Sequence, residues 1–164
     1  MVCSCLQFNE RLKDHLCEDI ELQLLELPGR GSRYDEPLCE SIDDMVNDSY
    51  SLISRQLDGF PFAIFGYSMG SLIAYELTHK FHQNQKPVHT FLCAREAPHI
   101  CYNKSKISAL SDNDFKMEIA SLGGTPKQLL ENSEMYSFFA PILRADYKAL
   151  ENYTFSKKNE SDGV

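Results

Sequence analysis

The stretch that decides the fold is Pro61-Phe62-Ala63-Ile64-Phe65-Gly66-Tyr67-Ser68-Met69-Gly70-Ser71. Its first five residues form a short apolar run that ends directly at a glycine, a pattern that indicates a buried strand. From Met69 onward, apolar side chains recur four residues apart at Ile73, Leu77 and Phe81, which predicts an amphipathic helix. The stretch therefore predicts a strand, a tight turn and a helix in immediate succession.

The turn contains a Gly-x-Ser-x-Gly pattern centred on Ser68. By composition alone, a chain of this length shows the pattern by chance about one time in twenty, but between a strand and a helix it indicates a nucleophile elbow. We expect a strained backbone at Ser68, and Gly66 and Gly70 where side chains would collide with the neighbouring strand and helix. The amide of Met69 would then face a developing oxyanion. The alternative is an ordinary Gly/Ser turn.

Outward from this stretch, helical and extended patterns alternate. Residues 7–16 favour a short helix, and Glu21–Leu27, bounded by Pro28 and Gly29, favours a strand. Residues 41–57 have helical spacing with a Ser41/Asp44 cap, and residues 88–94 predict a second buried strand. This order predicts an α/β fold in which helices cover both faces of a parallel sheet.

Beyond residue 100 the pattern is helical throughout. Ser111 with Asp114 predicts the cap of one helix, which Gly123 and Gly124 end. The next helix is expected to start at residues 125–126, with its proline in the first helical position. Pro141 is expected to begin a last helix that runs to about residue 153, before a polar, frayed stretch over 156–164.

Composition narrows the class of protein. The length of 164 residues suits one domain, and a net charge of -8 disfavours nucleic acid and anionic membranes as partners. We expect no membrane span, no signal peptide and, without a CxxC pair, no metal site. The six cysteines (Cys3, Cys5, Cys17, Cys39, Cys93 and Cys101) are expected to be free thiols in a reducing cytoplasm.

Several further segments carry a family resemblance that covers about residues 7–155. They are Leu27-Pro28-Gly29-Arg30-Gly31-Ser32-Arg33, Glu36-Pro37, Ala74-Tyr75-Glu76-Leu77, Ala97-Pro98, Leu122-Gly123-Gly124-Thr125-Pro126 and Pro141-Ile142-Leu143-Arg144-Ala145-Asp146-Tyr147. Together with the serine motif they resemble the type II thioesterases of the α/β-hydrolase superfamily. The resemblance implies hydrolysis of acyl groups from the phosphopantetheine arm of acyl or peptidyl carrier proteins in nonribosomal peptide, polyketide or fatty acid synthesis. It implies no cofactor, because the substrate carries the phosphopantetheine.

The resemblance also assigns a helical lid to about residues 103–152 of a single domain over 1–164. The lid's apolar side chains either pack against the core, which we favour for most, or line an acyl pocket; they are Phe115, Ile119, Leu129, Met135, Phe138, Phe139 and Ile142. Arg30, Arg33 and Arg144 either touch a phosphate or carrier protein, or pair with nearby carboxylates, and we favour pairing.

The family's first strand, its catalytic aspartate and its C-terminal histidine have no counterpart in this chain, so the resemblance suggests a partial α/β-hydrolase fold, truncated at both ends. The family's usual histidine before the nucleophile is Tyr67 here. His79 and His82 are expected on the solvated surface, and His89 at the wrong end of its strand. A substitute triad of Ser68, Glu96 and His99 is conceivable, because His99 follows the strand after the nucleophile.

Three functions are compatible with the sequence. The first is an acyl-thioester hydrolase, and the second is an inactive fragment that only binds acyl chains or carrier protein. The third is another serine hydrolase, such as an esterase or lipase, against which the lid motifs argue. A sheet with open edges also predicts poor solubility or self-association.

Overall fold

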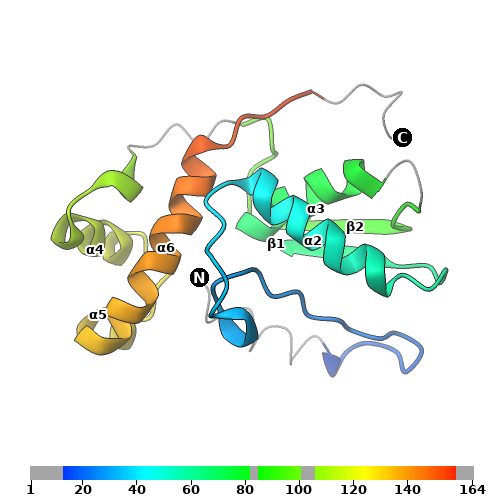
Figure 1. The fold of residues 1–164 in the computed structure, drawn as a ribbon, viewed down its shortest axis with the longest axis horizontal. Helices are drawn as coiled ribbons and strands as arrows, with labels where there is room; N and C mark the ends of the chain where they lie inside the picture. Colours follow the sequence, from blue (N-terminus) through cyan, green and yellow to red (C-terminus); the bar gives the residue numbers. More distant parts are fainter. Residues whose placement is uncertain (1–12, 82–84, 101–105, 158–164) are drawn as a thin grey trace.

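The computed structural model describes residues 13–81, 85–100 and 106–157. The elements alternate up to residue 93 and are helical afterwards (Figure 1). In chain order they are η1 (Gly31–Arg33), α2 (Ile42–Gln56), β1 (Ala63–Tyr67), α3 (Met69–Lys80), β2 (His89–Cys93), η3 (Ile107–Ala109), α4 (Asp112–Ser121), α5 (Lys127–Glu131) and α6 (Ser133–Asn152). The α/β class and the parallel sheet flanked by helices are thereby confirmed.

The two strands pair in parallel, from Ala63 opposite His89 to Tyr67 opposite Cys93. Helix α3 connects them and packs on both, while α2 packs on α3 from the same side. The expected cover on the second face is not seen among the described residues, where Phe65 of β1 remains 38% exposed and Phe91 of β2 48% exposed. The strands are therefore buried less than their apolar sequences predict.

A first core joins α2 and α3. It contains Leu27, Ile42, Met45, Val46, Leu72, Ile73, Leu77, Phe81 and Ala149. Phe81, just past the end of α3, contacts the rings of Tyr50 and Phe62 at centroid distances of 4.6 and 5.4 Å. The side chain of Ser41 accepts a hydrogen bond from the amide of Asp44 at 3.1 Å, which confirms the predicted cap of α2. The stacked apolar face of α3 is the side that builds this core.

A second core lies within the C-terminal helices. It contains Ile107, Phe115, Ile119, Leu129, Leu130 and Leu143. The elements η3, α4, α5 and α6 form what we call the helical layer, which lies beside the sheet and its two helices (Figure 1). Packing is confirmed for most of the apolar side chains considered above, but Met135 and Phe138 are exposed. No helix within the described ranges is both long and apolar enough to cross a membrane.

Several predicted boundaries were wrong. Residues 21–27 form no strand, because a strand needs a hydrogen-bonded neighbour and the described part of the sheet offers only the β1–β2 pair. Of the helix predicted over 7–16, residues 7–12 lie outside the described residues, residue 13 is helical, and residues 14–16 form a turn and a bend. The predicted cap of α4 at Ser111 is confirmed, and the helix ends as expected just before Gly123 (φ +70°), with Leu122 as its C-cap.

The predicted positions of two prolines relative to their helices were wrong. Pro126 caps α5 instead of occupying its first turn, and Pro141 lies inside α6 instead of beginning it. Helix α6 starts after Asn132, whose side chain accepts a hydrogen bond from the amide of Met135 at 3.0 Å. A proline inside a helix removes one backbone hydrogen bond and crowds the preceding turn. Tyr136 and Phe139 before Pro141 pack against the second core, and Leu143 and Ala149 after it are buried in the second and first cores, so packing on both sides of the proline offsets that cost.

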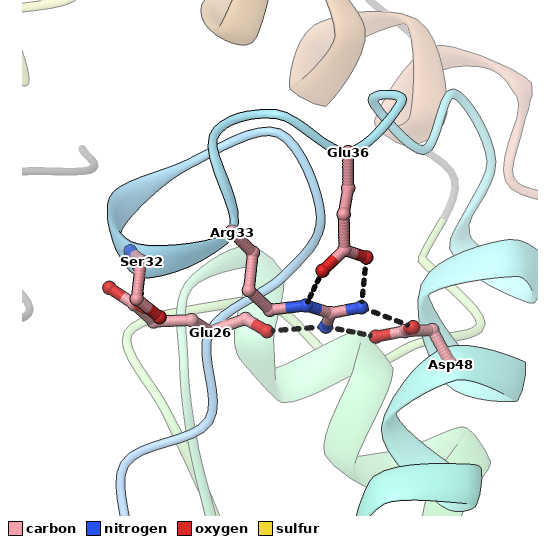
Figure 2. A network of polar contacts seen from close by, with 5 residues as sticks. All are labelled: Glu26, Ser32, Arg33, Glu36 and Asp48. Carbon is pink, nitrogen blue, oxygen red and sulfur yellow. Dashed lines mark hydrogen bonds and ion pairs between the residues drawn. The ribbon is translucent and has the colours of Figure 1, made fainter.

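The loop before α2 is fixed by Arg33 (Figure 2). Its guanidinium donates to both carboxylate oxygens of Asp48 in α2 at 2.7 and 2.8 Å, to both of Glu36 at 2.6 and 2.8 Å, and to the carbonyl of Glu26 at 2.8 Å. The hydrogen bonds to Asp48, and then those to Glu36, raise the pKa of Arg33. Structural pairing is thus confirmed for Arg33.

Glu26 holds the other side of the same loop. Its carboxylate accepts hydrogen bonds from the hydroxyl and the amide of Ser32 at 2.5 and 2.8 Å, and these lower the pKa of Glu26. A Cβ at Gly31 would lie 1.8 Å from the same carboxylate, so a larger residue would displace the Glu26 side chain from Ser32, and the φ of +54° favours glycine independently. The carboxylates around this loop are bound in their ionised form.

This arrangement predicts acid sensitivity. The folded pKa values of Glu26 and Glu36 lie below their unfolded values, so their stabilisation is present above the unfolded pKa of about 4.3 and is lost as pH falls through the folded values. We expect Glu26→Gln to lower stability at about pH 7 and to lose less on acidification to about pH 3, as measured by urea unfolding. Glu21→Gln on the exposed segment before the loop is the control, and an equal acid loss in wild type and Glu26→Gln would contradict the interpretation.

Candidate active site

Ser68 occupies the turn between β1 and α3 with φ 54° and ψ -117°. A non-glycine residue with positive φ is strained, at a cost of about 1–3 kcal/mol. The strained turn expected from the sequence is therefore confirmed. The amide of Ser68 donates a 2.9 Å hydrogen bond to the carbonyl of Cys93 at the end of β2, so the neighbouring strand holds the turn in place.

The two glycines of the motif differ. A Cβ at Gly66 would lie 2.3 Å from the carbonyl oxygen of Gly70 and 2.8 Å from the Cβ of Ala74, so strand and helix approach too closely for a side chain. At Gly70 a Cβ would meet no described atom within 4 Å. The predicted collision is confirmed for Gly66 and wrong for Gly70, because the side of α3 at residue 70 faces open space in the described structure.

Ser71 is a structural residue of the turn that the sequence analysis did not single out. Its buried hydroxyl lies 3.0 Å from the carbonyl oxygen of Gly66 and 2.7 Å from that of Cys93, and it accepts a hydrogen bond from the amide of Cys93 at 3.0 Å. A hydroxyl has one proton, so it donates to one of the two carbonyls at a time. A small polar residue on the buried side of an apolar helix was the available signal.

The start of α3 is open to a negatively charged group. Met69 is its first residue, so the amide of Met69 has no partner within the helix and lies at the positive end of the helix dipole. Ser68 precedes it without a side-chain capping hydrogen bond. The half-buried hydroxyl of Ser68 and this amide therefore lie side by side in sequence at the carboxyl end of β1.

Glu96 and His99 are the residues that were considered as partners of Ser68 in a substitute triad. Glu96 and His99 are both exposed beyond the carboxyl end of β2, and the His99 ring packs against Phe155 at a centroid distance of 6.0 Å. No hydrogen bond between described residues joins Ser68, Glu96 and His99 to one another. The substitute triad stays a prediction.

Two of the other histidines can be compared with their predicted positions. His89 begins β2, at the end of the sheet opposite Ser68, as predicted. His79 is half-buried and contacts the Tyr75 ring at 4.6 Å, so its expected position on the solvated surface was wrong: an aromatic neighbour on the preceding turn covers it. His82 lies outside the described residues.

A hollow of about 340 Å³ lies between the loop around η1 and α6. It is lined by Gly29, Tyr34, Glu36, Leu38, Phe138, Pro141 and Ile142. Phe138 and Ile142 belong to the apolar set that was expected to pack or to line a pocket. None of the lining residues belongs to the turn at Ser68.

Comparison with known proteins gives a consistent result. The family model described as Thioesterase domain matches residues 6–162. The gramicidin S biosynthesis protein GrsT of Aneurinibacillus migulanus is 37% identical over 140 residues, which are 84% of this chain and 54% of that protein. The human medium-chain S-acyl fatty acid synthase thioesterase is 33% identical over 139 residues, covering 82% and 52%.

Solved structures agree in fold. ClbQ from the colibactin NRPS/PKS pathway superposes with a TM-score of 0.83 at 34% identity, covering 93% of this chain and 64% of that one. The type II thioesterase BorB from the borrelidin biosynthetic cluster gives a TM-score of 0.79 at 27% identity, covering 93% and 62%. The chain spans about half the length of the curated relatives it matches.

The two glycines provide a matched test of the turn. Gly66→Ala is expected to lower the free energy of unfolding by about 1–3 kcal/mol, because its Cβ must push β1 away from α3. Gly70→Ala is expected to leave stability unchanged or to raise it by up to about 1 kcal/mol, because alanine favours the helix. Chemical denaturation of both variants measures the difference, and equal losses would contradict the close approach at Gly66.

Proposed function

We propose that this chain, which belongs to the Thioesterase domain family, hydrolyses acyl thioesters held on the phosphopantetheine arm of carrier proteins, with Ser68 as the nucleophile. The observation that carries the proposal is the strained backbone of Ser68 at the junction of β1 and α3. Strain at one polar residue, maintained by the hydrogen bond that its amide donates to β2, is characteristic of a functional position. The family membership supports the thioester as the bond that is cleaved.

The proposed reaction has two steps. The Ser68 hydroxyl loses its proton to a base as its oxygen attacks the thioester carbonyl, and the amide of Met69 donates to the resulting oxyanion. The carbon–sulfur bond then breaks, the thiolate of the phosphopantetheine takes the proton, and an acyl-serine ester remains. Water attacks that ester and gives a proton to the base, the bond between the acyl carbon and the serine oxygen breaks, and the base returns the proton to that oxygen as the carboxylic acid is released.

The base is the unassigned part of this mechanism. His99, with Glu96 beside it, is the candidate that lies beyond the carboxyl end of β2, next to the strand end that holds Ser68. Its ring would have to leave Phe155 and turn toward Ser68. In this role His99 would accept the serine proton and Glu96 would orient the imidazole.

A second candidate function is binding without turnover. The observation that favours it is that, within the described ranges, no base is hydrogen-bonded to Ser68. Such a protein would retain acyl chains or carrier proteins but release no acid. The ion pairs of Arg30, Arg33 and Arg144 indicate that neither function uses these side chains as free cations for an acidic partner.

The proposed setting is the cytoplasm, with no cofactor and with no nucleic acid or membrane partner. Cys17, Cys39 and Cys93 carry free thiols, and burial raises the pKa of Cys39, which keeps that thiol protonated and unreactive. The acidic composition, with a net charge of -8, supports the same setting by disfavouring nucleic acid and anionic lipid.

Turnover of an acyl-pantetheine thioester tests the function. Free acid is measured by chromatography, since a thiol reagent would also react with the protein's cysteines. Ser68→Ala is expected to lower the rate by about 10³-fold or to the uncatalysed background, because the nucleophile is removed. Intact-mass analysis after a single addition of substrate shows whether an acyl group is attached.

The outcomes separate the two candidates. Acid release that needs Ser68 supports the hydrolase. An acyl adduct on wild type, absent from Ser68→Ala and not hydrolysed, supports a nucleophile without a base and hence the second candidate. Equal rates in both proteins, with no adduct, would sink the assignment of Ser68. Gly70→Ala is the folded control, because a Cβ at that position meets no described atom.

Self-association is the other proposed interaction. Phe91 and Leu92 of β2 are 48% and 45% exposed, and Val88 before them is 69% exposed. Exposed apolar strands pair readily with other chains. We expect oligomers by light scattering coupled to size-exclusion chromatography, and fewer of them for Phe91→Lys than for Met117→Lys on the exposed side of α4. A monodisperse wild-type monomer would contradict this proposal.

A further inference from the structure

Arg30 and Asp146 form the most buried ion pair among the described residues. The guanidinium donates to both carboxylate oxygens, at 2.8 and 3.0 Å, and the two side chains are 11% and 13% exposed. Arg30 belongs to the loop before α2, and Asp146 belongs to α6, so the pair joins segments that are 116 residues apart. The expected structural pairing of Arg30 is confirmed. Unlike an exposed surface pair, this one is largely buried and joins two distant segments of the chain.

The loop presents Arg30 from a rigid backbone. Gly29 has φ +77°, and a Cβ there would lie 2.4 Å from the side chain of Leu38. The amide of Gly29 donates to the carbonyl of Arg33 at 3.0 Å, and Arg33 is itself bound to Asp48 of α2. Arg30 is therefore attached firmly to the part of the molecule that contains α2, α3 and the sheet.

Asp146 lies between the two cores along α6. Leu143, three residues before it, is buried in the second core, and Ala149, three residues after it, is buried in the first. Tyr147 packs against the second core and Leu150 against the first. Residues three and four apart share a face of a helix, so Asp146 lies where one core gives way to the other.

We propose that the Arg30–Asp146 ion pair sets the orientation of the helical layer relative to the part of the molecule that carries Ser68. Each part has its own core, and α6 is the helix common to both. Removing one partner of a buried pair leaves the other charge without compensation, which favours separation of the two segments. The layer then pivots about the C-terminal end of α6, where Ala149 and Leu150 stay packed in the first core.

The Arg30–Asp146 pair also controls the width of the hollow between the loop and α6. Leu38 and Tyr34 form its wall on the loop, and Ile142 and Phe138 form its wall on α6, four and eight residues before Asp146. The pair thus fixes the separation of the two walls close to one edge. The conformational device is independent of the proposed reaction and holds whether or not the chain hydrolyses a thioester.

A distance measurement in the full chain tests whether the ion pair sets the orientation of the helical layer. Spin labels are placed through non-natural amino acids at Asn113 of α4 and Arg55 of α2, both exposed, because cysteine labelling would also modify the native thiols. In Asp146→Asn, which keeps the shape of the side chain and removes its charge, the distribution of label distances is expected to broaden and its maximum to shift. Amide exchange within α2 and α4 is expected to stay as slow as in wild type.

A neighbouring ion pair supplies the control. Lys148 of α6 pairs with Glu40, and both side chains are about half exposed. Exposed pairs contribute little, so Glu40→Gln is expected to leave the distance distribution unchanged. Arg30→Lys retains the charge but cannot bind both carboxylate oxygens in the same way, and it is expected to give a smaller shift in the same direction as Asp146→Asn.

Three results would overturn the proposal. One is an unchanged distance distribution in folded Asp146→Asn. Another is a parallel rise of amide exchange in α2 and α4, which would make the pair a stabiliser of the whole fold. The last is a failure of both Asp146→Asn and Arg30→Lys to fold, because the two cores would then depend on the pair for their own packing.

Discussion

The close approach of β1, α3 and β2 around Ser68 is the constraint on which the rest of the structure depends. Gly66 lets the helix lie against the strand, while the Ser68 amide and the Ser71 hydroxyl bind the end of β2. These contacts hold a non-glycine residue at positive φ, which the chain would otherwise avoid. The same packing directs the apolar face of α3 into the first core, so site and core form together.

Three arginines of this acidic chain connect its segments through ion pairs within the molecule. Arg33 anchors the loop to α2, Arg30 connects that loop to α6, and Arg144 donates to the carbonyl of Ser108 and to the carboxylate of Asp112 within the helical layer. Arg144 also lies 4.2 Å from the centre of the Phe115 ring, which joins an ion pair to the second core. The ion pair of Arg30, which connects the two parts of the molecule, therefore has a structural role.

Local chemistry explains which elements could be predicted. The caps at Ser41 and Ser111 and the helix over Met69–Lys80 depend on neighbouring residues, and these predictions were confirmed. The strand expected over 21–27 and the cover on the second face of the sheet depend on partners elsewhere in the chain, and these failed among the described residues. Pro141 was placed by its usual preference, yet α6 is continuous through it, with partly buried Tyr136 and Phe139 packed before it and buried Leu143 and Ala149 after it.

By itself, the sequence determined the order of strand, turn and helix and the identity of Ser68 as the candidate nucleophile, because these follow from periodicity and from the steric needs of glycine over a few residues. Only the tertiary structure decided that Gly66 but not Gly70 is sterically required, that Ser71 fastens the turn, and that Arg30 meets Asp146. Those contacts join residues from separate elements. Their distances are set by packing, which no local pattern records.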